Sequence, residues 1–248
     1  MANTRLCPTT NGPGLHLGHI CMALVNEAEA HSTGGRFLVR FDDNQKQWMD
    51  KQAPGEARGY ADRMREDLEW FGIRVDGYSF QTDVETWVPA HEIWNRLTGQ
   101  KYPLNNLTQG ASQSHAPEVP TDPSSQYPYA PFLTAEKVVF DYMQKIDLLI
   151  RGFDLLGEYS LYSYLCDLWN IPIPRQIFLP RLQLSEGKGF NSRVDVSKTS
   201  SKCMVRDMKK AFSAASLQEM LAIAYLKAPE GPWLASNVKA MPVLKGGS

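Results

Sequence analysis

The stretch that decides the fold is TRLCPTTNGPGLHLGHI, residues 4–20. Its first four residues are a short candidate strand, and residues 8–14 form a loop that holds two glycines and two prolines. From Leu17 onward, apolar residues recur at helical spacing. The run RFLVRF at residues 36–41 is typical of a buried parallel strand. A strand, a loop, a helix and a second strand in this order predict a βαβ unit at the start of the chain.

Helical and strand patterns alternate through the rest of the chain. Amphipathic periodicity predicts helices at 60–71, 87–97, 135–142 and 161–168, and a last helical region at about 204–226. Thr134 is a candidate N-cap of the third of these helices. Short apolar runs predict buried strands at 146–150 and 176–184. Such alternation is typical of an α/β fold with a mainly parallel sheet.

Composition limits the class of protein. The 248 residues are 43% hydrophobic and include no apolar run long enough to span a membrane, so we expect one sizeable core, no membrane partner and a cytoplasmic location. The net charge of -1 argues against DNA as a partner but leaves room for a local basic patch. The cysteines are too far apart for a metal knuckle or a dense disulfide framework; they are Cys7, Cys21, Cys166 and Cys203.

The segment His16-Leu17-Gly18-His19 stands where a helix begins after a loop. Helix amides and the helix dipole form an anion site there, and Gly18 lets a nucleotide approach the backbone. Two imidazoles can donate hydrogen bonds to phosphate oxygens as charge develops on them. These features favour nucleotidyl transfer. The structural alternative is that one histidine is solvated and the other only caps the helix.

A second candidate phosphate site lies near the other end of the chain. Residues 196–199 read VSKT and are followed by Ser200, Ser201 and Lys202. Hydroxyls and lysines in one loop are suited to holding a triphosphate. The alternative interpretation is an ordinary solvated loop.

These segments resemble the glutamyl and glutaminyl branch of the class I aminoacyl-tRNA synthetases. Residues 4–19 are similar to its first strand and HIGH signature, and GGRFLVRFDD at 34–43 is similar to its GGxFxxRxED segment. The later matches keep the family's order along the chain: DLEWFG at 67–72, QTD at 81–83, IRGFDLL at 150–156, PRQI at 174–177, LPRL at 179–182 and DVSKT at 195–199 in the KMSKS position. The resemblance covers most of the chain.

The resemblance implies a role for each matching residue. The catalytic residues would be His16, His19 and Lys198. ATP would contact Pro8, Thr9, Gly18, Asp154, Leu182, Val196, Ser197 and Thr199. The amino acid would contact Arg5, Asp42, Leu133 and Arg151. In this picture Arg5 pairs with a substrate carboxylate, Asp42 holds the α-ammonium, and Mg²⁺ is bound by the phosphates, with no metal ligand from the protein and no structural zinc.

Three positions depart from the family pattern. Leu133 stands where the family has a substrate-contacting tyrosine, Phe153 replaces an acidic residue, and Asp195 replaces the first lysine of the signature loop. The amino acid specificity therefore does not follow from the resemblance alone.

The resemblance also implies a domain organisation. We expect a Rossmann-like, doubly wound parallel sheet with HIGH and KMSKS type signatures and a much reduced insertion. Residues 1–102 would form its first half and residues 132–248 its second half. The proline-rich segment 103–131 would be an insert or loop in place of the acceptor-stem-binding domain. About twenty residues follow position 226, too few for an anticodon-binding domain.

The function expected from these observations is ATP-dependent activation of glutamate, glutamine or a close analogue as an aminoacyl adenylate. The acceptor would be a small amine, a carrier protein or an RNA end rather than a fully decoded tRNA. Three alternatives stay open: a truncated synthetase that grips tRNA, a noncatalytic amino acid and ATP binding paralogue, and a nucleotidyltransferase. The basic residues available to grip RNA are Lys188, Arg193, Lys202, Arg206, Lys209 and Lys210, which a solvated helix would also carry.

Overall fold

The computed structural model describes residues 1–10, 14–43, 56–99, 131–179, 183–184, 205, 213–215 and 243–244. The strands are β1 Thr4–Leu6, β2 Phe37–Phe41, β3 Gly77–Phe80, β4 Leu148–Gly152, β5 Arg175–Leu179, β6 Gln183–Leu184 and β7 Val243–Leu244. The helices are α1 Leu17–Ser32, α3 Glu56–Trp70, α4 Val84–Thr98, α6 Pro131–Met143, the 3-10 helix η2 Phe153–Glu158 and α7 Tyr159–Leu168.

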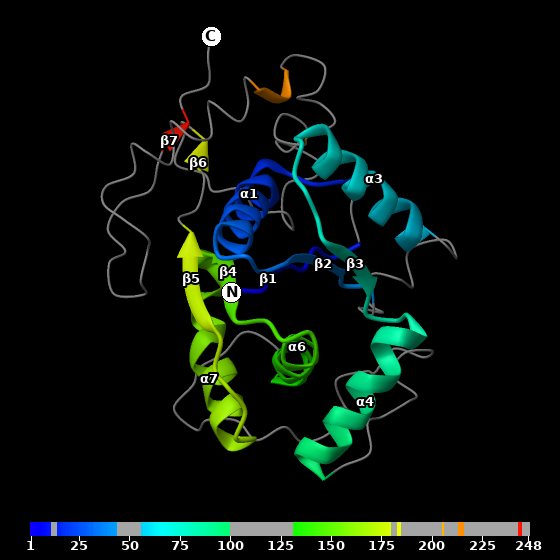
Figure 1. The fold of residues 1–248 in the computed structure, drawn as a ribbon, viewed down its shortest axis with the longest axis vertical. Coiled ribbons are helices and arrows are strands. Elements are labelled where there is room, and N and C mark those ends of the chain that lie inside the picture. Colours follow the sequence, from blue (N-terminus) through cyan, green and yellow to red (C-terminus); the bar gives the residue numbers. More distant parts are fainter. Residues whose placement is uncertain are drawn as a thin grey trace.

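The main sheet has five strands in the order β3-β2-β1-β4-β5, and every pair in it is parallel. The chain therefore winds outward from β1 in one direction through β2 and β3, and in the other through β4 and β5 (Figure 1). This confirms the α/β, doubly wound parallel sheet. The order reverses between β1 and β4, and in open α/β sheets ligands bind at such a switch point, beyond the carboxyl ends of the strands.

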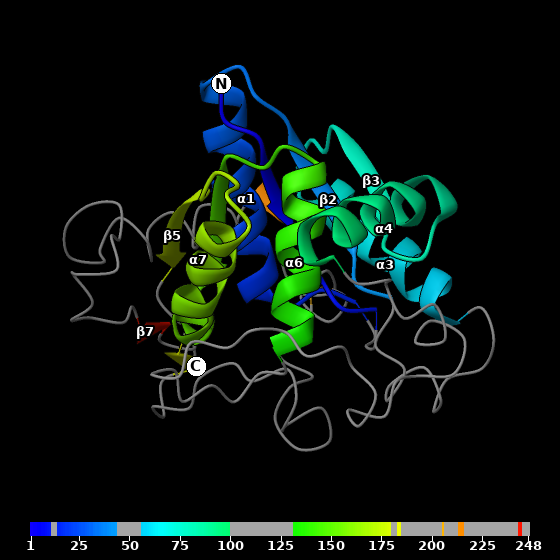
Figure 2. The ribbon, with the colours of Figure 1, turned by 90° about the horizontal axis from the view of Figure 1, so that it is seen from below.

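Helices cover both faces of the sheet, and each face has its own apolar core. In Figures 1 and 2, α1 and α3 lie on one side of the sheet and α4, α6 and α7 on the other. The first core joins α1 and α3 to β1 and β2, with Ile20, Phe37 and Leu68 among its buried residues. The second joins α4, α6 and α7, with Trp94 and Leu165 among its members.

Strand alternation places a set of charged side chains on the second face. Thr4 pairs in register with Leu148, so Arg5 and Arg151 point to the face opposite that of these two residues. Arg40 shares the Arg5 face, because Arg5 pairs with Leu38 and Arg40 lies two residues further along β2. Three arginines from three adjacent strands are therefore directed toward α6 and α7.

Most predicted elements are confirmed, and three details are corrected. The helix at 135–142 begins at Pro131 instead, so Thr134 lies inside α6 and is not its N-cap; proline is favoured in the first turn because its missing N–H would be unpaired there. The strand at 176–184 is wrong as one unit, since β5 ends at Leu179 and β6 belongs to another sheet. The edge strand β3 is not anticipated from the sequence. Most of the region 204–226 lies outside the described residues.

Candidate functional site

Helix α1 begins at the carboxyl end of the central strand, and its first turn is closed by two histidines. His16 is the N-cap, and its Nδ1 accepts a hydrogen bond from the backbone N–H of His19 at 3.3 Å. In return, Nδ1 of His19 accepts from the backbone N–H of His16 at a longer 3.5 Å. The two rings stack with their centroids 3.8 Å apart. The sequence motif is therefore a reciprocal capping box.

This capping box decides which ring nitrogens can donate. Burial, together with the nearby His16, lowers the pKa of His19 well below its usual value, so the ring is neutral at physiological pH. A neutral imidazole carries one proton, and Nδ1 acts as an acceptor in both histidines, so the proton resides on Nε2. The first turn of α1 thus offers two neutral N–H donors at the N-terminus of a helix, where the helix dipole favours an anion.

The loop before His16 is held in place through the backbone of Leu15. The carboxylate of Asp67, on α3, accepts from the N–H of Leu15 at 2.9 Å. The N–H of Val205 donates to the carbonyl of Leu15 at 3.1 Å, and Val205 is fully buried in the first core. Gly14 has φ +141, and a β-carbon there would lie 2.8 Å from Asp67 Oδ2. A glycine is therefore required before Leu15.

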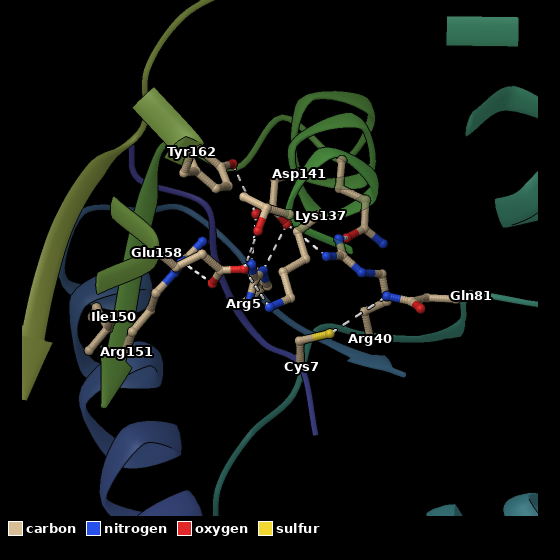
Figure 3. Close-up of polar contacts among 12 residues, drawn as sticks. Arg5, Cys7, Arg40, Gln81, Lys137, Asp141, Ile150, Arg151, Glu158 and Tyr162 are labelled. Carbon is tan, nitrogen blue, oxygen red and sulfur yellow. Dashed lines mark hydrogen bonds and ion pairs between the residues drawn. The ribbon is translucent and has the colours of Figure 1, made fainter. Parts of the chain in front are cut away.

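On the opposite face of the sheet, Asp141 of α6 gathers two of the strand arginines. Arg5 pairs with it side-on, Nε to Oδ1 and Nη2 to Oδ2, both at 2.7 Å. Nη2 of Arg40 lies 2.9 Å from Oδ1, and the hydroxyl of Tyr162 donates to Oδ2 at 3.0 Å (Figure 3). Burial alone would raise the pKa of Asp141, but the charges of Arg5 and Arg40 outweigh it and hold that pKa well below its usual range.

A second carboxylate, Glu158 at the end of η2, binds the third strand arginine. Oε2 accepts from Nη1 of Arg151 at 2.9 Å, and Oε1 accepts from Nζ of Lys137 at 2.7 Å (Figure 3). Oε1 also accepts from the hydroxyl of Thr134 at 2.9 Å. The guanidinium of Arg151 lies 4.8 Å from the centre of the Tyr162 ring, so the two carboxylate groups belong to one assembly. We call Arg5, Arg40, Lys137, Asp141, Arg151 and Glu158 the charged cluster.

The model of the class I tRNA synthetase (E and Q) catalytic domain matches residues 1–95. Glutamate–tRNA ligase 2 of Erythrobacter litoralis is 34% identical over 110 residues, which are 44% of this chain and 22% of that protein. Glutamate–tRNA ligase 1 of Novosphingobium aromaticivorans is 38% identical over 79 residues, or 32% of this chain and 16% of that protein. Residues 1–95 are similar to the catalytic domain of the class I glutamyl and glutaminyl synthetases.

The solved structures extend the likeness of fold beyond the matched segment. A glutamate tRNA ligase from Elizabethkingia meningosepticum, solved in complex with its amino acid, has a TM-score of 0.62 at 17% identity and covers 90% of this chain and 60% of that one. A glutamate-tRNA synthetase from Elizabethkingia anophelis has a TM-score of 0.57. The chain spans only about a fifth of the length of the curated relatives that it matches.

The remaining predicted site residues fall into three groups. Asp42 is buried, and its backbone links β2 to the loop after β1 by hydrogen bonds with Pro8 and Thr10, while Thr9 forms a bridge with Asp42. Pro8, Thr9 and Asp42 are thus brought to the carboxyl end of β1, and Gly18 lies in the first turn of α1. The backbones of Leu133 in α6 and Asp154 in η2 are described, but their side chains are not. Outside the described residues lie Leu182, Val196, Ser197, Lys198 and Thr199.

Sequence reasoning missed the acidic half of the charged cluster. Asp141 follows Val138 by three residues, so a charge on the apolar stripe of α6 was a usable signal. No comparable pattern marks Glu158, which is buried because a turn of 3-10 helix brings it back to Arg151. Among the described residues no three histidine, cysteine or acidic side chains converge as metal ligands, and no helix is long and apolar enough to cross a membrane.

Proposed function

We propose that this chain activates an amino acid, either glutamate, glutamine or a close analogue, by joining its carboxylate to the α-phosphate of ATP. The product is an aminoacyl adenylate, and pyrophosphate is released. The observation that carries the proposal is the pair of Nε2–H donors at the N-terminus of α1, at the switch point of the sheet. Mg²⁺ held by the phosphates would neutralise part of their charge.

The residues present fit such a reaction. A carboxylate nucleophile needs no general base, so the protein has only to orient the reactants and stabilise charge on the α-phosphate. His16 and His19 supply neutral donors for this, and the first amides of α1 add the field of the helix terminus. Gly18 has no side chain, and a β-carbon there would lie 3.0 Å from Cε1 of His16, so a larger residue would displace that ring.

Lys198 would complete the site from the second half of the chain. Val205, seven residues further on, is hydrogen-bonded to the residue just before His16. Seven residues span at most about 25 Å, so Lys198 lies within reach of a triphosphate bound at α1. The contact between Val205 and Leu15 supports the convergence of the two signatures on one nucleotide.

The acceptor we propose is a small amine, a carrier protein or an RNA end rather than a fully decoded tRNA. Helices α4 and α6 pack directly on each other through Trp87, Trp94 and Val138. Only residues 99–130 separate these two helices in sequence, and a folded domain usually needs 50 residues or more. The proposed domain division, 1–102, 103–131 and 132–248, leaves no room for an acceptor-stem domain between the sheet halves.

ATP–pyrophosphate exchange, measured across all amino acids with and without RNA, tests this function. We expect exchange with glutamate, glutamine or an analogue, and a loss of about a hundredfold or more in His19→Ala and Lys198→Ala, the scale found when one transition-state donor is removed. His31→Ala is the matched control, since His31 pairs with Asp76 at the opposite end of α1. Unchanged exchange in both variants would show that the catalytic assignment is wrong. Amino acid binding without exchange would identify a noncatalytic paralogue.

A further inference from the structure

Glu158 is a fully buried carboxylate that has no part in the proposed chemistry. Each of its oxygens lies against a cation: Oε2 is 2.9 Å from Nη1 of Arg151, and Oε1 is 2.7 Å from Nζ of Lys137. Burial by itself would raise its pKa, but the charges of Lys137 and Arg151 and the hydrogen bonds to the carboxylate lower it instead. Glu158 is therefore a fixed negative charge at neutral pH.

Arg151 keeps one edge of its guanidinium unoccupied. Glu158 takes Nη1, while Nε and Nη2 are buried and have no hydrogen-bond partner among the described residues. The same edge of Arg5 is already filled by both oxygens of Asp141. An Nε and Nη2 edge binds a carboxylate with two parallel bonds. Arg151, rather than Arg5, therefore has the unpartnered edge that could bind a substrate carboxylate.

The residues of the charged cluster determine the net charge around the unpartnered edge of Arg151. The charged cluster has four cations and two carboxylates, so two positive charges are in excess. Glu158 is the carboxylate that contacts Arg151 directly. At an effective dielectric constant of about 20, two unit charges roughly 7 Å apart interact strongly enough to change a dissociation constant by about tenfold or more. A negative charge on Glu158 would therefore weaken the binding of a carboxylate at Arg151. Glu158 thus reduces the attraction of this position for an anion.

We propose that Glu158 is a specificity-determining residue that lowers the preference of the site for an amino acid with a carboxylate side chain over its neutral amide. Lys137 acts in the opposite direction, because its ammonium group offsets the charge of Glu158. This inference rests on the proposed function, since it assumes that Arg151 faces the amino acid.

The test compares two ligands of nearly the same shape. L-glutamate and L-glutamine are titrated into the full chain by calorimetry, without ATP, and the ratio of the glutamine to the glutamate dissociation constant is measured. Damage to the fold weakens the binding of both ligands and leaves the ratio of the dissociation constants unchanged. A charge effect changes that ratio. In Glu158→Gln, which keeps the shape and removes the charge, we expect the ratio to rise about tenfold.

Two further variants complete the design. Lys137→Met removes a cation from the other side of Glu158, so the ratio should fall by about as much. Glu29→Gln removes the same charge from the distant end of α1, where the nearest cation is Arg175 at 3.8 Å, so the ratio should stay within twofold of the native value.

A ratio that is unchanged or lower in Glu158→Gln would overturn the inference, as would a native chain that binds neither ligand. Pyrophosphate exchange separates the two proposals. If exchange occurs while the ratio does not respond to Glu158, amino acid activation stands and the role of Glu158 is wrong.

Discussion

At the scale of single residues, Asp67 connects the core to the candidate phosphate site. It sits on α3, is buried, and accepts the N–H of Leu15, the residue just before His16. No side chain fits at Gly14, because a β-carbon would meet Asp67 Oδ2 at 2.8 Å. The position of the first histidine therefore depends on one glycine and one carboxylate outside residues 16–19.

Gly14→Ala should consequently lower both the rate of exchange and the free energy of unfolding. Both the steric clash and the positive φ of Gly14 oppose a side chain, at a cost of about 1–3 kcal/mol in the free energy of unfolding, and relieving the clash displaces Leu15. We expect exchange to fall about tenfold or more, since small displacements of catalytic groups are costly. Urea unfolding and exchange assays measure the two effects.

Gly72→Ala is the matched control for that prediction. Gly72 has φ +70, and nothing lies within 4 Å of a β-carbon placed there. Its substitution should strain the backbone after α3 without moving the loop. If Gly14→Ala and Gly72→Ala lower exchange equally, the loop has no special part in catalysis.

Single residues also show how much of the candidate site could be predicted from the sequence. Arg5 and Arg151 are charged residues in otherwise apolar strands, and the structure places both in one buried cluster. The sequence assigned Arg5 to a substrate carboxylate, a role that stays a prediction, but Asp141 already fills its side-on edge. Partners such as Asp141 and Glu158 lie 136 and 7 positions from the arginines they bind. Tertiary packing brings Asp141 to Arg5, and the 3-10 helix η2 brings Glu158 back to Arg151.

At the scale of elements, the first turn of α1 has two functions that one substitution can separate. His16 caps the helix through Nδ1, and its Nε2 is the proposed donor to the phosphates. Asparagine is a good N-cap but has no group in place of Nε2. His16→Asn should therefore keep the free energy of unfolding within about 0.5 kcal/mol and lower exchange about a hundredfold. Thermal unfolding and exchange measure the two functions, and unchanged exchange in His16→Asn would mean that His16 is only a cap.

Which elements could be predicted depends on how deeply each is buried. Strands β1, β2 and β4 are buried along almost their whole length, so their apolar runs stand out in the sequence. Strand β3 is a four-residue edge strand, GYSF, with one fully buried position, and such a segment resembles a loop. The start of α6 was misplaced because Thr134 looks like a cap, whereas its hydroxyl bonds to Glu158 across the cluster.

At the scale of the whole molecule, the sheet separates two kinds of chemistry. The first turn of α1 lies at the carboxyl end of the sheet and offers neutral donors, while the α6 face carries the charged cluster. Arg5 and Arg151 are on neighbouring strands at the switch point, so both regions border the same end of the sheet. An amino acid near the arginines and a nucleotide at α1 would approach each other there, as adenylate formation requires.

The buried charges also predict how stability depends on pH. Burial lowers the pKa of His91 from 6.5 to about 4, so the unfolded chain takes up more protons and stability falls as the pH drops from about 6.5 to 4. The lowered pKa of Asp141 acts in the same direction: its contribution is present above its unfolded pKa of 3.8 and is lost as the pH falls below it. The pKa of Asp43, which burial raises, opposes this trend.

We therefore expect the free energy of unfolding, measured in urea at several pH values, to decrease in two steps on acidification. His91→Phe, which keeps a ring against Trp87, should flatten the step between about pH 6.5 and 4. Asp141→Asn should flatten the lower step, and at pH 7 it should cost about 3–5 kcal/mol because Arg5 and Arg40 lose a buried partner. If the native chain is equally stable at pH 7 and pH 4, the prediction for His91 is wrong. If its stability does not fall further below about pH 3.8, the prediction for Asp141 is wrong.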